Sequence, residues 1–72
     1  MNSLGERLKT LRKVRNLTQK QVAEDIGAGL RNYQRYEYNE KRPMYDILIA
    51  LADYFDVSLD YLVGRSDCPK RK

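Results

Sequence analysis

The stretch from Thr18 to Glu37 constrains the fold more than any other part of the sequence. Gln21 lies three positions after Thr18, and this spacing is the capping-box signature of a helix N-terminus. Gly27 follows at the expected helix end, where glycine adopts the left-handed backbone conformation at little cost. Ala23 is small enough to let a second helix cross closely. The stretch therefore predicts two short helices joined by a sharp turn at Gly27.

Local signals predict three further helices around this pair. Ser3 and Glu6 form another capping box, and apolar residues then recur at helical spacing, at Leu4, Leu8, Leu11 and Val14. The remaining boundaries predict a helix from about Leu30 to Tyr38 with Gly29 near its N-cap and Asn39 closing it, an apolar central helix from about Met44 to Phe55, and a short helix capped by Ser58 that runs through Val63 and ends at Gly64.

The length and the distribution of polar residues bound the domain organisation. A chain of 72 residues makes one domain, and we expect it to span residues 1–64. Residues 65–72 are polar and basic, so the sequence predicts a frayed or disordered tail there.

The charge balance favours a polyanionic partner. The formal net charge is +4 and the pI is about 9.4, although part of the excess lies in the last three residues. An apolar run of about 18 residues, which a membrane span requires, does not occur in the sequence. The first ten residues contain no apolar signal core, which predicts a cytoplasmic location.

Residues able to perform catalysis or to bind a metal are scarce. The chain has no histidine and one cysteine, Cys68, so neither a zinc site nor an internal disulfide is expected. Ser3 and Ser58 fit helix caps, and the carboxylates of the predicted helices have no shared partner: Asp25, Asp46 and Asp60 fall on separate helices. The sequence therefore predicts a protein that is not an enzyme and that needs no cofactor.

The second helix of the central pair has two different faces. Tyr33 and Tyr36 are three positions apart, so they share one face, which we expect to bury with Val22 and Ile26 against the rest of the protein. The residues left outward or at the flanks are polar, cationic or apolar: Leu30, Arg31, Asn32, Gln34 and Arg35. A protruding helix with Arg and Asn near its N-terminus suits the DNA major groove.

These residues together support a family resemblance. The segment LTQKQVAEDIG, followed nine residues later by YE and then by KRP, resembles the Xre/Cro-type helix-turn-helix DNA-binding domain of phage-repressor-like regulators. The later segment ILIALADYFDVSLDYLVG is similar to the fourth and fifth helices of that family. The resemblance covers residues 4–64 and implies an all-α fold, a compact five-helix bundle of the lambda-repressor type.

The resemblance also implies roles for individual residues. Matching positions suggest base contacts for Leu30, Arg31, Asn32 and Arg35, and phosphate contacts for Gln19, Arg12, Tyr38, Asn39, Lys41 and Arg42. Gly29 and Gln34 flank the recognition helix, while Ala23, Gly27, Tyr33, Tyr36 and Glu37 match structural positions. Arg12 with Glu37 matches an internal salt bridge. Three base assignments stay open: Leu30 either touches a thymine methyl or packs on the preceding helix, Asn32 either contacts adenine or caps the helix, and Arg35 contacts either a base or a phosphate.

The implied function is sequence-specific binding of double-stranded DNA in transcriptional control. We expect a repressor that binds a palindromic operator as a homodimer, through the fourth and fifth helices with Tyr54 and Tyr61 at the interface. The alternative is a protein-interaction module on the same fold, such as an antitoxin or an adaptor. Its contact surface would be the apolar and aromatic fourth and fifth helices.

Overall fold

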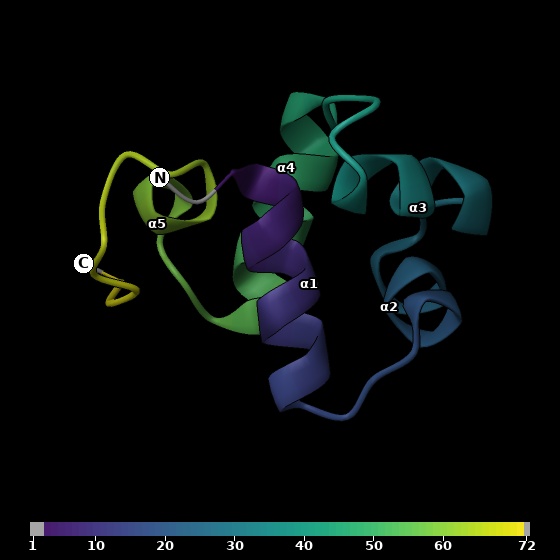
Figure 1. Ribbon diagram of the computed structural model, residues 1–72, viewed down its shortest axis with the longest axis horizontal. Helices are drawn as coiled ribbons and strands as arrows, with labels where there is room; N and C mark the ends of the chain where they lie inside the picture. The colour runs from purple at the N-terminus through teal and green to yellow at the C-terminus, as the bar shows by residue number, and fades with distance from the viewer. Residues whose placement is uncertain (1–2, 72) are drawn as a thin grey trace.

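The structure, a computed structural model, describes residues 3–71 and contains five helices and no strand within that range. The helices are α1 (Leu4–Val14), α2 (Gln19–Ile26), α3 (Leu30–Glu37), α4 (Tyr45–Phe55) and α5 (Leu59–Leu62). Figure 1 shows α2 and α3 on one side of α1 and α4, with α5 and the C-terminal segment on the other. This arrangement confirms the predicted all-α, five-helix fold. None of the helices described is long and apolar enough to cross a membrane.

The helix boundaries follow the local signals in the sequence. Ser3 and Thr18 each complete a capping box, with Glu6 and Gln21 respectively. Gly27 ends α2 in the left-handed conformation with φ 76°. Three predicted ends shift by one residue: Tyr38 is the C-cap of α3, Met44 is the N-cap of α4, and Val63 is the C-cap of α5.

The core forms where α1, α2, α3 and α4 meet and extends to α5. Its buried apolar residues are Leu8, Val22, Ala23, Tyr33, Tyr36, Leu51, Ala52, Phe55, Val57 and Leu62. The predicted apolar stripe of α1 is wrong at its last member, because Val14 is 73% exposed. Val14 lies in the last turn of α1, which extends past the end of α4 (Figure 1). The stripe that packs therefore ends at Leu11.

The first turn of α1 lies directly against the C-terminal end of α3. A Cβ atom on Gly5 would lie 2.3 Å from the backbone oxygen of Glu37 and 2.8 Å from Oδ1 of Asn39. The backbone N–H of Gly5 donates to that Oδ1 at 3.1 Å, and Nδ2 of Asn39 donates to Oγ of Ser3 at 3.0 Å. Asn39 itself has φ 60°, which asparagine tolerates. Gly5 and Asn39 thus fix the end of α3 on α1.

The C-terminal segment packs against the helices, whereas the sequence predicted a frayed or disordered tail. The backbone N–H of Ser58 donates to the oxygen of Pro69 at 3.0 Å. Arg71 donates to the backbone of Ala52 at 3.2 Å and to the carboxylate of Asp53 at 2.6 Å. These partners lie on or beside α4 and α5, so residues 65–71 cover that side of the bundle. Residues 1–2 of the predicted domain and residue 72 of the predicted tail lie outside the described residues.

Arg7 holds the same segment from the side of α1. Its side chain is buried, and it donates to the backbone oxygen of Ser66 at 2.9 Å and to the carboxylate of Asp67 at 3.1 Å. The guanidinium also lies 4.0 Å from the ring centroid of Tyr61, a cation–π distance. Tyr61 is therefore partly covered by Arg7.

Candidate DNA-binding interface

The turn between α2 and α3 sets the angle between these two helices. Gly27 donates to the backbone oxygen of Glu24, and Ala28 donates to that of Ala23, which closes the end of α2. A Cβ on Gly27 would meet no atom within 4 Å, so this position needs glycine for its positive φ and not for space. Ala23 is buried in the core. Gly27 therefore permits the turn through its backbone conformation, and Ala23 permits the close crossing of the helices through its small, buried side chain.

The two faces of α3 divide as the sequence analysis expected. Tyr33 and Tyr36 are buried and pack edge to face with ring centroids 6.5 Å apart. The opposite side of the helix carries Arg31 and Asn32, which are exposed, and Leu30, which is 40% exposed. Gln34 and Arg35 are half-buried at the flanks. The first turn of α3 thus presents polar, cationic and apolar side chains to solvent, on the surface of a helix whose other side is fixed in the core.

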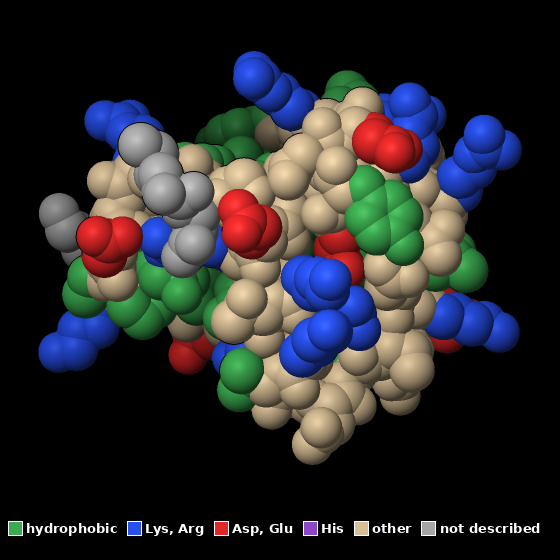
Figure 2. Space-filling view, in the orientation of Figure 1, with side chains coloured by type: hydrophobic (Ala, Val, Ile, Leu, Met, Phe, Trp, Pro, Cys, Tyr) green, Lys and Arg blue, Asp and Glu red, His purple; other side chains and the backbone are tan. Residues whose placement is uncertain are grey.

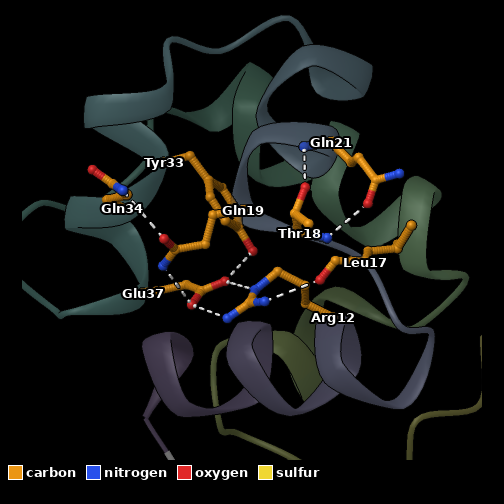
Figure 3. Close-up of polar contacts among 8 residues, drawn as sticks. All are labelled: Arg12, Leu17, Thr18, Gln19, Gln21, Tyr33, Gln34 and Glu37. Atoms are coloured by element: carbon orange, nitrogen blue, oxygen red, sulfur yellow. Dashed lines mark hydrogen bonds and ion pairs between the residues drawn. The ribbon is translucent and has the colours of Figure 1, made fainter.

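Glu37 is the centre of a buried polar network between α1, α2 and α3 (Figure 3). Its carboxylate accepts hydrogen bonds from Nε of Arg12 at 2.6 Å and Nη2 of Arg12 at 3.1 Å. It also accepts from the hydroxyl of Tyr33 at 2.6 Å and from Nε2 of Gln19 at 3.1 Å. Nη1 of Arg12 donates to the backbone oxygen of Leu17 at 3.0 Å. The network joins both ends of the helix-turn-helix to α1.

The network shifts the protonation equilibria of its members. Burial by itself raises the pKa of Glu37, but the hydrogen bonds from Arg12, Tyr33 and Gln19 outweigh burial and hold the pKa below its ordinary value. The hydrogen bond to Glu37 raises the pKa of Arg12. Burial, together with the hydrogen bond to Glu37, raises the pKa of Tyr33. Glu37 is therefore ionised and Tyr33 neutral at pH 7.

Gln19 connects this network to the outward side of α3. Its Nε2 donates to Glu37, and its Oε1 accepts from Nε2 of Gln34 at 3.2 Å. Figure 3 shows Gln34 reaching from α3 toward the end of the Gln19 side chain. The two contacts fix the orientation of the Gln19 amide, and one hydrogen on its Nε2 is left for a further acceptor. Sequence reasoning had placed Gln34 only as a flanking residue.

The loop after α3 borders the same surface. Tyr38 is 58% exposed, and Lys41 and Arg42 are also exposed. Nζ of Lys41 donates to Oδ1 of Asn32 at 3.3 Å, so the loop lies beside the first turn of α3. The side chain of Asn39 points instead to α1, as described above.

Basic side chains are not confined to this surface. Figure 2 shows Lys and Arg side chains extending from the side occupied by α2 and α3, and others at the opposite end of the molecule. Among residues 3–71, no group of three His, Cys, Asp or Glu side chains lies together in a way that could hold a metal ion. What distinguishes the α3 surface (Leu30, Arg31, Asn32, Gln34 and Arg35) is thus its place on a helix whose other side is buried in the core, and not charge alone.

The structure brings most of the predicted site residues onto one surface, and several of them also have hydrogen-bond partners within the chain. Lys41 lies against the base-contact candidate Asn32, and Gln19 borders α3 through Gln34. Arg12 and Asn39 have much of their hydrogen-bonding capacity used inside the protein. Gly5 was missed by sequence reasoning, because no local pattern marks a glycine that another helix approaches.

A capped helix, a turn at a left-handed glycine and a second helix with one buried and one polar exposed side define a helix-turn-helix domain of the DNA-binding type. The match to a family model agrees with this class. The chain belongs to the helix-turn-helix family, whose model matches residues 8–62. This confirms the resemblance inferred from the sequence.

Known proteins similar to this chain are transcriptional regulators. It is 45% identical over 67 residues to the uncharacterised HTH-type transcriptional regulator YobD of Bacillus subtilis (strain 168), covering 93% of this chain and 60% of that protein. It is 43% identical over 62 residues to the cryptic phage CTXphi transcriptional repressor RstR of Vibrio cholerae serotype O1 (strain ATCC 39315 / El Tor Inaba N16961), covering 86% of this chain and 55% of that protein. The chain thus spans little more than half the length of these relatives.

A solved structure gives the same fold in a complex with DNA. The P22 c2 repressor bound to a synthetic operator superposes with a TM-score of 0.86 at 26% sequence identity, covering 92% of this chain and 100% of that one. The helical arrangement of this chain is therefore one that a known repressor adopts while bound to a synthetic operator.

Proposed function

We propose that this domain binds double-stranded DNA in a sequence-specific way as part of a cytoplasmic transcriptional repressor. The observation that carries the proposal is the exposed first turn of α3, with Arg31 and Asn32 outward, on a helix that Glu37 and Gly5 hold rigidly to α1. Rigid presentation matters because base contacts require the side chains to meet the groove in one register. The similarity to repressors supports this assignment.

In this proposal α3 lies in the major groove. Leu30, Arg31, Asn32 and Arg35 contact base edges, and Arg31 donates two hydrogen bonds to a guanine. Side chains around the groove contact phosphates: Gln19, Tyr38, Lys41 and Arg42. Arg12 and Asn39 contribute phosphate contacts only through the donor hydrogens that their internal partners leave unused.

Replacing Arg31 with alanine tests the base-contact assignment. We expect Arg31→Ala to weaken binding to the selected operator roughly 5- to 150-fold, because a bidentate contact to guanine provides about 1–3 kcal/mol of discrimination. Binding to random DNA should change much less. The measurement is a titration by fluorescence anisotropy at several salt concentrations. The logarithm of the affinity should fall by about 0.9 per log unit of salt for each phosphate neutralised.

Arg65→Ala is the matched control for that experiment, since Arg65 is exposed and lies outside the α3 surface. It removes the same charge and should leave operator affinity close to that of the wild type. Equal losses on operator and random DNA for Arg31→Ala would assign Arg31 to phosphate. Operator binding that does not respond to salt would argue against the proposed function as a whole. If the protein then bound a protein partner instead of DNA, the interaction-module alternative would be favoured.

We further propose that two copies associate with each other through α4 and α5 and together bind a palindromic operator. Tyr54 and Tyr61, the predicted interface residues, already have partners within the chain. The Tyr54 hydroxyl donates to Asp25 at 2.7 Å, and the Tyr61 ring lies beneath the guanidinium of Arg7. At α5 itself, the exposed apolar side chains are those of Leu59 and the C-cap residue Val63, which are 38% and 39% exposed. Half-sites one helical turn apart would place two such domains side by side.

Introducing a charge at Leu59 tests this dimer. Leu59→Lys should weaken binding to DNA with two half-sites roughly tenfold or more, because like charges facing each other across a two-fold axis are costly. Binding to a single half-site should be unchanged. Val14→Lys is the control, since Val14 is exposed on α1 and outside α4 and α5. A two-site affinity unaffected by Leu59→Lys would exclude α5 from the interface.

A further inference from the structure

Glu40 is an acidic residue on the surface that we propose faces DNA. It follows the left-handed Asn39, and its backbone N–H donates to the oxygen of Arg35 at 2.9 Å, which folds the chain back over the end of α3. Its side chain is exposed. It lines a hollow of about 430 Å³ on the outer side of α3, together with Arg31, Gln34, Arg35 and Tyr38. A carboxylate therefore shares one hollow with two of the base-contact candidates.

This carboxylate keeps its charge available to a partner. Within the described residues, Glu40 takes part in none of the ion pairs, which join Arg7 to Asp67, Arg12 to Glu37, and Arg71 to Asp53 and Asp56. Arg31 and Arg35 line the same hollow without bridging to it. An unpaired anion brought against DNA is repelled by phosphate and by the acceptor atoms of bases. It is compensated only by a hydrogen-bond donor on the DNA.

The donors that the major groove offers are limited. Cytosine presents its N4 amine and adenine its N6 amine, whereas guanine and thymine present acceptors at this edge. Carboxylates characteristically accept from the amine of cytosine. Arg31, in the same hollow, has the donor geometry for guanine. Cytosine is thus the base that a carboxylate next to a guanine-binding arginine fits best.

We propose that Glu40 is a specificity-determining residue that selects cytosine through a hydrogen bond to its N4 amine. The inference rests on the proposed function and deepens it by naming a base that the α3 surface selects. Glu40 favours operators that place cytosine at this position, and it penalises sequences that place an acceptor there. Its negative charge also lowers affinity for DNA in which no amine meets it.

Selection of bound sites from random DNA tests this proposal with the wild type and Glu40→Ala. We expect the wild-type motif to contain a cytosine whose replacement lowers affinity roughly tenfold, as is typical of one mismatched base pair. In Glu40→Ala that preference should disappear, while the rest of the motif stays and affinity for random DNA rises. The exposed position of Glu40 predicts an unchanged melting temperature, which circular dichroism checks.

Asp60→Asn is the matched control, because it removes one negative charge from α5, on the opposite side of the bundle from α3 (Figure 1). It should leave the motif unchanged. If Glu40→Ala raised affinity equally for every sequence and kept the cytosine preference, Glu40 would act only as a long-range charge and the inference would be overturned. A wild-type protein that selects no motif would overturn the proposed function itself, which the experiment thereby separates from the role of Glu40.

Discussion

Gly5→Ala is expected to lower the free energy of unfolding by about 2–3 kcal/mol, at the upper end of what overpacking a tight site costs. The new Cβ would lie 2.3 Å from the backbone oxygen of Glu37. A backbone atom in a helix end does not move aside as a flexible side chain does, so α1 and α3 must separate. Separation also weakens the hydrogen bond from Gly5 to Asn39. These losses exceed the gain of about 1 kcal/mol that alanine brings to a helix.

Urea denaturation monitored by circular dichroism measures this effect, and Gly29→Ala provides the matched control. Gly29 has φ −69°, and a Cβ there meets no atom within 4 Å. Its replacement should cost less than about 1 kcal/mol, the difference in capping preference. If Gly5→Ala were as stable as the wild type, the close contact between α1 and α3 described here would be wrong.

Gly5→Ala should also weaken operator binding under conditions where the variant remains folded. Gly5 lies far in the sequence from α3, yet it sets where the end of α3 rests on α1. A displacement of a fraction of an ångström there moves the base-contact residues against the groove. Loss of operator affinity without loss of random-DNA affinity would assign this positional effect to α3.

Local chemistry explains which features the sequence predicts well. Ser3, Thr18 and Gly27 specify helix ends through hydrogen bonds and backbone preferences that involve only a few neighbouring residues. The alternation of buried and exposed side chains on α3 follows from the spacing of Tyr33 and Tyr36. These signals were sufficient to predict five helices and the outward turn of α3.

Features that depend on distant partners could not be obtained in the same way. Helical spacing put Val14 on the apolar stripe of α1, but spacing does not tell where the opposing helix ends. Gly5 looks like an ordinary helical glycine until α3 is placed against it. Arg7 contacts Ser66 and Asp67, which lie 59 and 60 positions further along the sequence. No local pattern in a polar, basic tail predicts such contacts. The pairing of Arg12 with Glu37 was available only through the family resemblance.

Arg12→Met is expected to destabilise the protein by about 3–5 kcal/mol at pH 7, the usual cost of leaving one partner of a buried ion pair alone. Methionine keeps an apolar stem of similar reach, so most of the loss comes from charge and hydrogen bonding. The side chain of Glu37 is 1% exposed and that of Arg12 is 13% exposed, so water cannot replace the guanidinium. Urea unfolding measures the difference. The double variant with Glu37→Gln should recover part of the loss, because no unpaired charge then remains.

The pH dependence of this loss separates an unpaired charge from lost packing. In the wild type the pKa of Glu37 is lowered, so its contribution to stability is complete above the unfolded pKa of about 4.3 and disappears as pH falls through the folded value. In Arg12→Met, burial is no longer offset by Arg12, and the pKa of Glu37 rises. Protonation then relieves the unpaired carboxylate as the pH is lowered. The stability difference between the two proteins should therefore shrink from pH 7 to pH 4, and a difference that stays constant would mean that lost packing, and not the charge of Glu37, dominates.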